Sequence, residues 1–453
     1  MQFTLEEYQE RSVQLMIESP FHYLAYEMGL GKTMIVLEYL RRTGKSALVV
    51  APLLVAQRTW PQEVKKWKAF RDELDTVVLH GPHKDLLVKT KARIKIINYD
   101  GLKWLYNHVK ERGSNDLASR VLVLDEGTYI KSPNSTRFKV LKSMQHFFTE
   151  GTFVLSGTPM PNGYKDIWSQ YWMLDRGAAL GKSFGEFKRR YFFESGPPRW
   201  VFEERQGAAE QIRASIAPMT SVLRAKDYLK LPETIHRTIP VELPASVREK
   251  YDTFKKDLVT TLEGTTVDAV SEGVLVNKLR QVTQGAFYHE DGVEFTKLHS
   301  AKLDALEELY TQADGDPILC PINFKFEVAM IRERLGDVPC IVGGMNLKEK
   351  EAILNKWDKG QVPLLLCHPA SMSHGVNIQL GGRLICWYGL PWSLEHYQQL
   401  NGRLVRRGQN RTVVIYHIKA EQTIDTRLTT VLAKKDITQE EFKRAMLEGI
   451  KNA

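Results

Sequence analysis

The sequence lacks the features of a secreted, membrane-spanning or zinc-binding protein. It has only four cysteines in 453 residues and no Cys-x-x-Cys pair, which argues against a zinc site. Each cysteine lies in or beside an apolar run, as buried, reduced thiols of intracellular proteins do. The longest apolar stretch is about half of the ~20 residues that a membrane span needs. The N-terminus is acidic and has no apolar signal segment. We therefore expect a soluble, cytoplasmic protein with no membrane partner.

Repeats, low-complexity tracts and a strong charge of one sign are also absent. The net charge is +9, which suits a polyanionic partner without requiring one. Hydrophobic residues make up 43% of the chain, enough for a packed core, so the composition excludes a disordered protein. At roughly 150 residues per domain, the length allows about three domains or two large ones.

Short apolar runs alternate with longer helical patterns in both halves of the chain. This alternation is typical of α/β domains whose mainly parallel sheets are flanked by helices. About five strands are expected in each half: 46–52, 76–81, 95–98, 121–126 and 152–159, then 317–322, 338–344, 362–369, 383–389 and 412–418. From Gly177 to about Glu308 the alternation of apolar runs and helical patterns is interrupted, and we expect helical insertions and a linker there. The predicted domains are 1–228 and 229–453, with a helical insertion at about 245–300.

A glycine-containing loop before an apolar helical pattern predicts a phosphate-binding site. Its glycines let backbone amides wrap a phosphate, and the helix N-terminus adds partial positive charge. Lys32 would reach the β- and γ-phosphates of a nucleotide, and the Thr33 hydroxyl would hold Mg²⁺. Tyr26 stands where the first glycine of the general pattern belongs. The nucleotide-binding residues predicted here are Met28, Gly29, Leu30, Gly31, Lys32 and Thr33.

Two acids follow the apolar run 121–124. Asp125 would bind Mg²⁺ through water, and Glu126 would orient or deprotonate the attacking water. Read alone, this segment is better explained as an ordinary strand that ends in a solvated acidic turn. Together with the phosphate loop it predicts the two halves of an ATP-hydrolysing site.

The order of these motifs resembles that of the Swi/Snf-type ATPases of helicase superfamily two, over nearly the whole chain. The segments that carry the resemblance in the first half are LEEYQ (5–9), EMGLGKT (27–33), APL (51–53) with Trp60 and Trp67, DEGTYIKSPNS (125–135) and LSGTP (155–159), and the linker segment 223–227 agrees. The resemblance implies two RecA-like domains and adenine contact by Gln9. It also implies that Ser156 and Thr158 couple hydrolysis to movement, and that the segment beginning at Ala51 contacts a nucleic-acid backbone.

In the second half, GVNI (375–378) resembles the family's fifth motif and QLNGRLVRRGQ (399–409) its sixth. The resemblance places Gly375 and Gln399 in coupling. Arg403 and Arg406 are three residues apart, so on a helix they would share a face and could serve as arginine fingers for the γ-phosphoryl group. A basic surface helix is the alternative. Thr128 stands where the family usually has a histidine that relays between the domains, which puts coupling in question.

Candidate contacts to a nucleic-acid backbone are Arg58, Lys131, Asn162 and Asn377, although each could equally be a solvated surface group. The stretch 187–193, with Arg199 and Trp200, interleaves bases and aromatics. It could form a DNA clamp or a helix whose aromatics pack in the core.

These features together predict an enzyme that uses ATP and Mg²⁺ to move along DNA, mostly duplex DNA. We expect a compact bacterial or phage form, acting as a monomer in a bacterial or phage-infected cell, with a recruiting protein possible in principle. Two alternatives remain open: a helicase that separates or anneals strands of branched DNA or RNA, and a nucleotide-gated DNA-binding switch with weak turnover.

Overall fold

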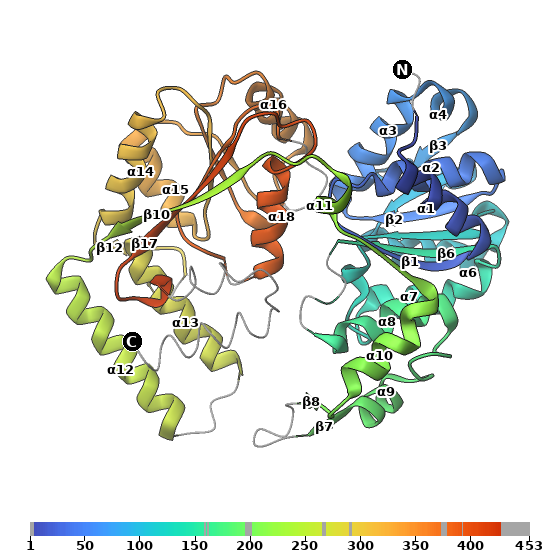
Figure 1. The fold of residues 1–453 in the computed structure, drawn as a ribbon, viewed down its shortest axis with the longest axis horizontal. Helices are drawn as coiled ribbons and strands as arrows, with labels where there is room; N and C mark the ends of the chain where they lie inside the picture. The colour runs from blue at the N-terminus through green and yellow to red at the C-terminus, as the bar shows by residue number, and fades with distance from the viewer. Residues whose placement is uncertain are drawn as a thin grey trace. The chain divides into compact units, whose positions relative to one another are not determined.

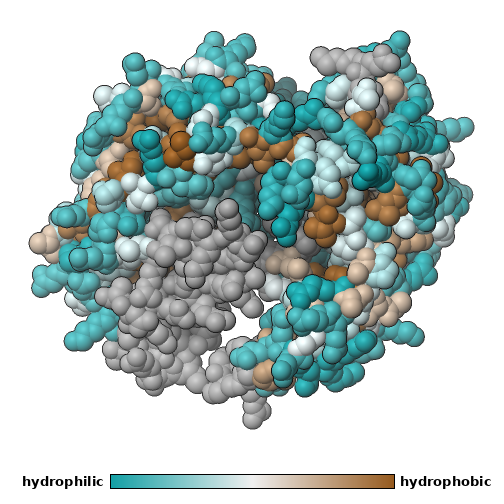
Figure 2. Space-filling model, viewed as in Figure 1, coloured by the Kyte–Doolittle hydropathy of each residue, from teal (hydrophilic) through white to brown (hydrophobic). Residues whose placement is uncertain are grey.

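The computed structural model describes residues 4–157, 160, 163–194, 202–264, 269–289, 292–372, 378–391 and 393–426. The chain divides into two compact units, one up to Lys230 and one that begins at Leu231 (Figure 1). In the described residues no helix is long and apolar enough to cross a membrane. Hydrophilic side chains predominate on the face shown in Figure 2, between smaller hydrophobic patches.

The first unit is built on a seven-stranded parallel sheet in the order β3-β4-β2-β5-β6-β1-β9. Its strands are β1 (Phe21–Tyr26), β2 (Ala47–Ala51), β3 (Thr76–Val78), β4 (Ile94–Asn98), β5 (Val121–Asp125), β6 (Gly151–Ser156) and β9 (Thr220–Leu223). Its helices are α1 (Glu7–Glu18), α2 (Lys32–Thr43), α3 (Trp60–Lys66), α4 (Lys68–Glu73), α5 (Lys84–Leu87), α6 (Leu102–Arg112), α7 (Thr136–Met144), α8 (Trp168–Asp175), α9 (Phe184–Tyr191), α10 (Ala208–Ile216) and α11 (Ala225–Tyr228). A short antiparallel hairpin, β7 (Phe192–Glu194) and β8 (Phe202–Glu204), follows α9.

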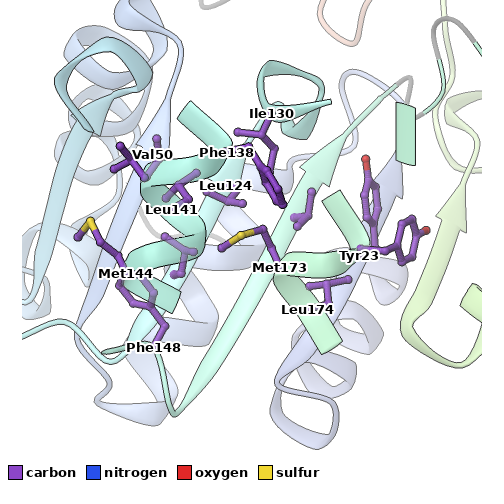
Figure 3. Packing of buried hydrophobic residues seen from close by; sticks show 14 of the residues in the cluster. Tyr23, Val50, Leu124, Ile130, Phe138, Leu141, Met144, Phe148, Met173 and Leu174 are labelled. Carbon is purple, nitrogen blue, oxygen red and sulfur yellow. The ribbon is translucent and has the colours of Figure 1, made fainter. Parts of the chain in front are cut away.

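This sheet is buried on both faces. On β5, Leu122 and Leu124 belong to a hydrophobic cluster shared with α6, α7 and α8, part of which is shown in Figure 3. Val121 and Val123 point to the opposite face, because successive strand residues alternate, and they are fully buried as well. The continuous apolar run of β5 therefore reflects helices on both sides of the sheet, as predicted.

The second unit is built on a six-stranded parallel sheet in the order β10-β17-β16-β13-β15-β14. Its strands are β10 (Thr234–Val241), β13 (Ile318–Pro321), β14 (Cys340–Ile341), β15 (Leu364–Cys367), β16 (Leu384–Trp387) and β17 (Val413–Ala420), besides the hairpin β11 (Ala286–Tyr288) and β12 (Phe295–Lys297). Its helices are α12 (Ala245–Gly264), α13 (Ala269–Gln284), α14 (Ala301–Gln312), α15 (Lys325–Leu335), α16 (Leu347–Asp358), α17 (Pro369–Met372) and α18 (Leu394–Leu404). All four cysteines lie in this unit, buried and unbridged, which confirms the prediction of buried thiols.

The α/β class and the parallel sheets are confirmed, but the strand count was too low. β1 was missed because its sequence, FHYLAY, mixes a histidine and two tyrosines with the apolar residues, although five of its six residues are buried. The interpretation of 177–308 as insertions and linker was incomplete. That stretch also supplies β9 and β10, which pair in parallel with β1 and β17.

Candidate nucleotide-binding site

The predicted phosphate loop joins the end of β1 to the start of α2. Gly29 and Gly31 have φ angles of 90° and 75°, which glycine adopts without the steric cost that a Cβ would bring. At Gly31 space is also short, because a Cβ there would lie 2.5 Å from Gln9 Nε2. Gly31 is the N-cap of α2 and Lys32 its first residue, so the amides of the first helical turn and the positive end of the helix dipole face the loop, where they favour an anion.

Gln9 lies on α1 and packs directly against this loop. Its side chain is buried, with Nε2 donating to the Leu30 carbonyl at 3.3 Å and Oε1 accepting from the Glu6 amide at 3.0 Å. The Tyr8 hydroxyl donates to the same Leu30 carbonyl at 3.3 Å. These contacts hold the loop against α1. The adenine contact predicted for Gln9 stays a prediction.

The loop is also tied to the segment that follows β9. The Glu27 amide donates to the Leu223 carbonyl at 3.0 Å, and Glu27 Oε2 accepts from the Ala225 amide at 2.7 Å. Lys32 Nζ donates to the Tyr26 carbonyl at 2.5 Å and to the Glu27 carbonyl at 3.3 Å. Glu27 stands in the EMGLGKT segment, but its contacts with residues almost 200 positions away were not predicted from the sequence.

The two predicted acids lie at the same edge of the sheet as the loop. β6 pairs with β5 on one side and with β1 on the other, and the carboxyl ends of parallel strands meet at one edge. Asp125 Oδ2 accepts a hydrogen bond from Trp60 Nε1 at 2.8 Å. Burial raises the pKa of Asp125 to about 6, against the opposing effects of the Trp60 hydrogen bond and the nearby Lys32 ammonium.

Glu126 has a left-handed backbone, with φ 63° and ψ 70°, which is uncommon for a residue other than glycine. Its Oε1 accepts from Ser156 Oγ at 3.0 Å and from Thr128 Oγ1 at 3.2 Å. The predicted catalytic acid and the predicted coupling serine are therefore in direct contact. Thr128, which replaces the family's histidine, donates to the same carboxylate.

Tyr99 supports the backbone at both acids. Its hydroxyl lies 3.0 Å from the Asp125 carbonyl and 3.3 Å from the Glu126 carbonyl. Nothing in the local sequence marks Tyr99, which precedes α6 and meets the acids only through the fold.

Mg²⁺ prefers hard oxygen ligands, and the predicted donors fit that preference. The Asp125 carboxylate and the Thr33 hydroxyl are of this type, and they come from β5 and the first turn of α2. Bound Mg²⁺ would neutralise phosphate charge during hydrolysis.

The segment predicted to contact nucleic acid begins at Ala51, the last residue of β2, and continues through a π-helix, η1 (Val55–Thr59), into α3. Arg58 is half-buried on η1, and Lys131 is half-buried 3.9 Å from Asp166. Trp60, by contrast, is fully buried, so this part of the motif faces Asp125 rather than a partner.

In the second unit, α18 carries Gln399 and Arg403, which are 3% and 8% exposed. Arg403 therefore does not belong to a solvated basic surface helix, the alternative considered for it. The helix ends at Leu404, so the inference that Arg406 shares a helical face with Arg403 was wrong. The backbone turns there, with the Arg406 amide donating to the Leu404 carbonyl.

Four predicted residues lie outside the described part of the chain: Thr158, Asn162, Gly375 and Asn377. Arg199 and Trp200 do as well. In the described part of the aromatic stretch, Phe187, Tyr191 and Phe192 are buried in the core of the first unit. This packing favours the structural interpretation of that stretch over a clamp.

Family models match most of the chain. The SNF2-related domain matches residues 8–286, and the helicase conserved C-terminal domain matches residues 301–408. The chain belongs to the SNF2-related family. It is therefore a helicase-like ATPase of superfamily two, and its two units are the RecA-like domains that the motifs predicted.

Relatives of this SNF2-related ATPase include a phage protein. Protein p41 of Acyrthosiphon pisum secondary endosymbiont phage 1 is 34% identical over 441 residues, which cover 92% of this chain and 94% of p41. That match agrees with a compact phage or bacterial form. The chicken (Gallus gallus) DNA repair and recombination protein RAD54-like is 22% identical over 89% of this chain, which spans only 62% of that protein. Among solved structures, the Sulfolobus solfataricus SWI2/SNF2 ATPase core in complex with dsDNA aligns over 100% of this chain and 96% of that one, with 20% identity and a TM-score of 0.44.

Proposed function

We propose that this SNF2-related ATPase couples ATP hydrolysis to movement along DNA, with duplex DNA as the preferred track. The observation that carries the proposal is the contact between Glu126, the residue placed to activate water, and Ser156, a residue of the coupling motif. Because one hydrogen bond joins them, a change at either residue reaches the other.

In the proposed reaction, the loop amides and Lys32 bind the phosphates, and Asp125 and Thr33 hold Mg²⁺, which neutralises charge when bound. Glu126 orients the attacking water and accepts its proton. Arg403 supplies positive charge to the γ-phosphoryl group in the transition state. Arg406 is proposed for the same role, although the two arginines do not share a helix.

DNA is proposed as the partner on three grounds: the family motifs, the net charge of +9 and the role in DNA repair named for the RAD54-like relative. Arg58, Lys131, Asn162 and Asn377 are the proposed backbone contacts. Contacts of this kind position a protein without reading sequence, so binding is expected to be non-specific.

The test is steady-state ATP hydrolysis by the wild type and by Glu126→Gln, alone and with duplex DNA, single-stranded DNA or RNA. We expect turnover that duplex DNA stimulates most and that Glu126→Gln abolishes. Glu203→Gln is the matched control, because Glu203 is an exposed acid on β8. A preference for single strands or RNA, together with strand displacement on forked substrates, would instead establish the helicase alternative. If no nucleic acid stimulates turnover, the proposed movement along DNA is wrong, and a nucleotide-gated switch is favoured.

A further inference from the structure

A fully buried tryptophan contacts one of the two acids of the ATP site. Trp60 has no exposed surface, and its indole N–H donates to Asp125 Oδ2 at 2.8 Å. A buried indole N–H needs an acceptor, and this one uses a carboxylate 65 residues away in the sequence. Because a hydrogen bond is directional, the contact fixes the rotation of the Asp125 carboxylate.

The same tryptophan is continuous with the segment predicted to contact nucleic acid. Trp60 directly follows η1, and its amide donates to the Val55 carbonyl in the wide π-helical pattern. Arg58 lies two residues before it. η1 packs against the neighbouring strands β2 and β4, and β2 pairs with β5, which ends at Asp125. π-helical turns are rare and are often found at functional sites.

A tryptophan on α6 provides an internal comparison. Trp104 Nε1 donates to Asp85 Oδ1 at 3.2 Å, so it also makes an indole–carboxylate hydrogen bond. That bond joins α6 to α5 and involves neither acid of the ATP site. The two tryptophans thus share the chemistry of their hydrogen bonds and differ in what those bonds hold.

We propose that Trp60 is a positioning residue that orients Asp125 for the magnesium–nucleotide complex and links the η1 segment to that carboxylate. When a nucleic acid binds to η1 and shifts or orders it, the hydrogen bond from the Trp60 indole N–H transmits that change to the Asp125 carboxylate. This inference rests on the proposed role of Asp125 in holding Mg²⁺. Trp60 itself touches neither nucleotide nor metal.

The test compares Trp60→Phe with Trp104→Phe in the full chain. The first readout is binding of a fluorescent ATP analogue, with MgCl₂ or with EDTA. Residues that orient metal ligands typically contribute about 10- to 100-fold to metal affinity. We therefore expect the increase in affinity for the analogue that Mg²⁺ brings to be about tenfold smaller in Trp60→Phe than in the wild type. In EDTA the variant should bind the analogue normally. Trp104→Phe should match the wild type in both conditions. Normal magnesium-dependent binding by Trp60→Phe would overturn the proposal.

The second readout is the ratio of ATP turnover with and without duplex DNA at saturating ATP. Trp60→Phe should lower this ratio while Trp104→Phe leaves it unchanged. An equal loss of basal and stimulated turnover would overturn the link to η1. If Trp60→Phe does not fold, a benzothienylalanine at position 60 keeps the shape of the indole and lacks the N–H, and the same results are expected from it.

Asp125→Asn separates this inference from the proposed function. If Asp125→Asn retains the gain from Mg²⁺, the proposed role of Asp125 is wrong. If Asp125→Asn loses that gain and Trp60→Phe keeps it, only the inference about Trp60 fails.

Discussion

At the scale of single residues, the candidate site depends on a strained backbone held by its neighbours. Glu126 adopts a left-handed conformation, which costs on the order of 1–3 kcal/mol for a residue with a Cβ. The Tyr99 hydroxyl lies within hydrogen-bonding distance of the Asp125 and Glu126 carbonyls, which belong to the two peptides that flank the Glu126 Cα. Ser156 and Thr128 hold the Glu126 side chain. Such strain persists where surrounding contacts determine it, and it often accompanies function.

Removing the Tyr99 hydroxyl should therefore affect catalysis as well as stability. Tyr99→Phe keeps the ring, which stacks on the Tyr129 ring with the centroids 4.9 Å apart. It removes the hydroxyl that donates to the Asp125 and Glu126 carbonyls. We expect a loss of about 1–2 kcal/mol in the free energy of unfolding and a lower kcat with little change in the KM for ATP. Denaturant unfolding and steady-state kinetics measure the two effects. Tyr106→Phe, a half-buried tyrosine on α6, is the control. A normal kcat in Tyr99→Phe would show that Glu126 keeps its position without this support.

At the scale of elements, α2 has glycines in a left-handed conformation at both ends, which makes a controlled comparison possible. Gly31 (φ 75°) precedes the helix and Gly44 (φ 70°) follows it. A Cβ at Gly31 would meet Gln9 Nε2 at 2.5 Å, whereas a Cβ at Gly44 would meet nothing within 4 Å. The two positions therefore share a left-handed backbone, which an added Cβ would strain in both, and they differ in the clash with α1.

Gly31→Ala should weaken binding of a fluorescent ATP analogue at least tenfold, because the loop must shift away from Gln9 or push it aside. Gly44→Ala should bind the analogue normally and lose only about 1 kcal/mol of stability, the cost of a left-handed conformation for a residue with a Cβ. Equal nucleotide affinities in the two variants would show that the contact between α1 and the phosphate loop is not needed for binding.

The strand β1 carries a buried histidine, which predicts a pH dependence of stability. His22 is 3% exposed, and neither ring nitrogen has a hydrogen-bond partner within the described residues. Burial lowers its pKa from 6.5 to about 4. The unfolded chain therefore binds a proton that the folded chain does not between these values, and stability falls as the pH drops from about 6.5 towards 4. The full effect is on the order of 3 kcal/mol.

His22→Phe should remove this contribution, so its stability relative to the wild type should rise as the pH is lowered from 7.5 to 5. Thermal unfolding at several pH values measures the difference, with His83→Gln as the control at an exposed position. A difference between His22→Phe and the wild type that stays constant over this range would mean that His22 does not titrate as described.

How far the sequence predicts these elements depends on whether their signal is local. β2 and β5 are continuous apolar runs, so composition alone predicts them. β1 was missed because its buried residues include His22 and Tyr23, and β9 and β10 because neither is a continuous apolar run. The site divides in the same way. Lys32, Asp125 and Glu126 stand in recognisable motifs that predict their roles. Trp60 also stands in a motif, but its contact with Asp125 is 65 residues away in the sequence, and the contact of Tyr99 with the Asp125 carbonyl is 26 residues away. Helix ends are similarly hard to predict, as Arg406 shows.

At the scale of the whole molecule, the proposed binding to DNA is electrostatic, so its affinity should depend strongly on salt concentration. Each phosphate that a protein neutralises on duplex DNA releases counterions, and the logarithm of the binding constant falls by about 0.9 per contact for each decade of salt. Arg58 and Lys131 are the proposed cationic contacts within the described residues. Asn162 and Asn377 are uncharged, so they should add affinity without adding to this slope.

Arg58→Ala and Lys131→Ala should therefore each weaken binding to duplex DNA and lower the salt slope by about one. Fluorescence anisotropy with a labelled duplex, over a series of salt concentrations, measures both quantities. Arg213→Ala is the control, because Arg213 is an exposed cation on α10 that pairs with Glu210. The loss should be similar for duplexes of different sequence, since backbone contacts carry no sequence information. A variant that loses affinity without a change in slope would act through the fold rather than through a phosphate, and its residue would then not be a contact. Arg58 is two residues from Trp60. If η1 transmits DNA binding to Asp125, Arg58→Ala should also lower ATP turnover at saturating DNA. If η1 does not transmit it, turnover at saturating DNA should not change.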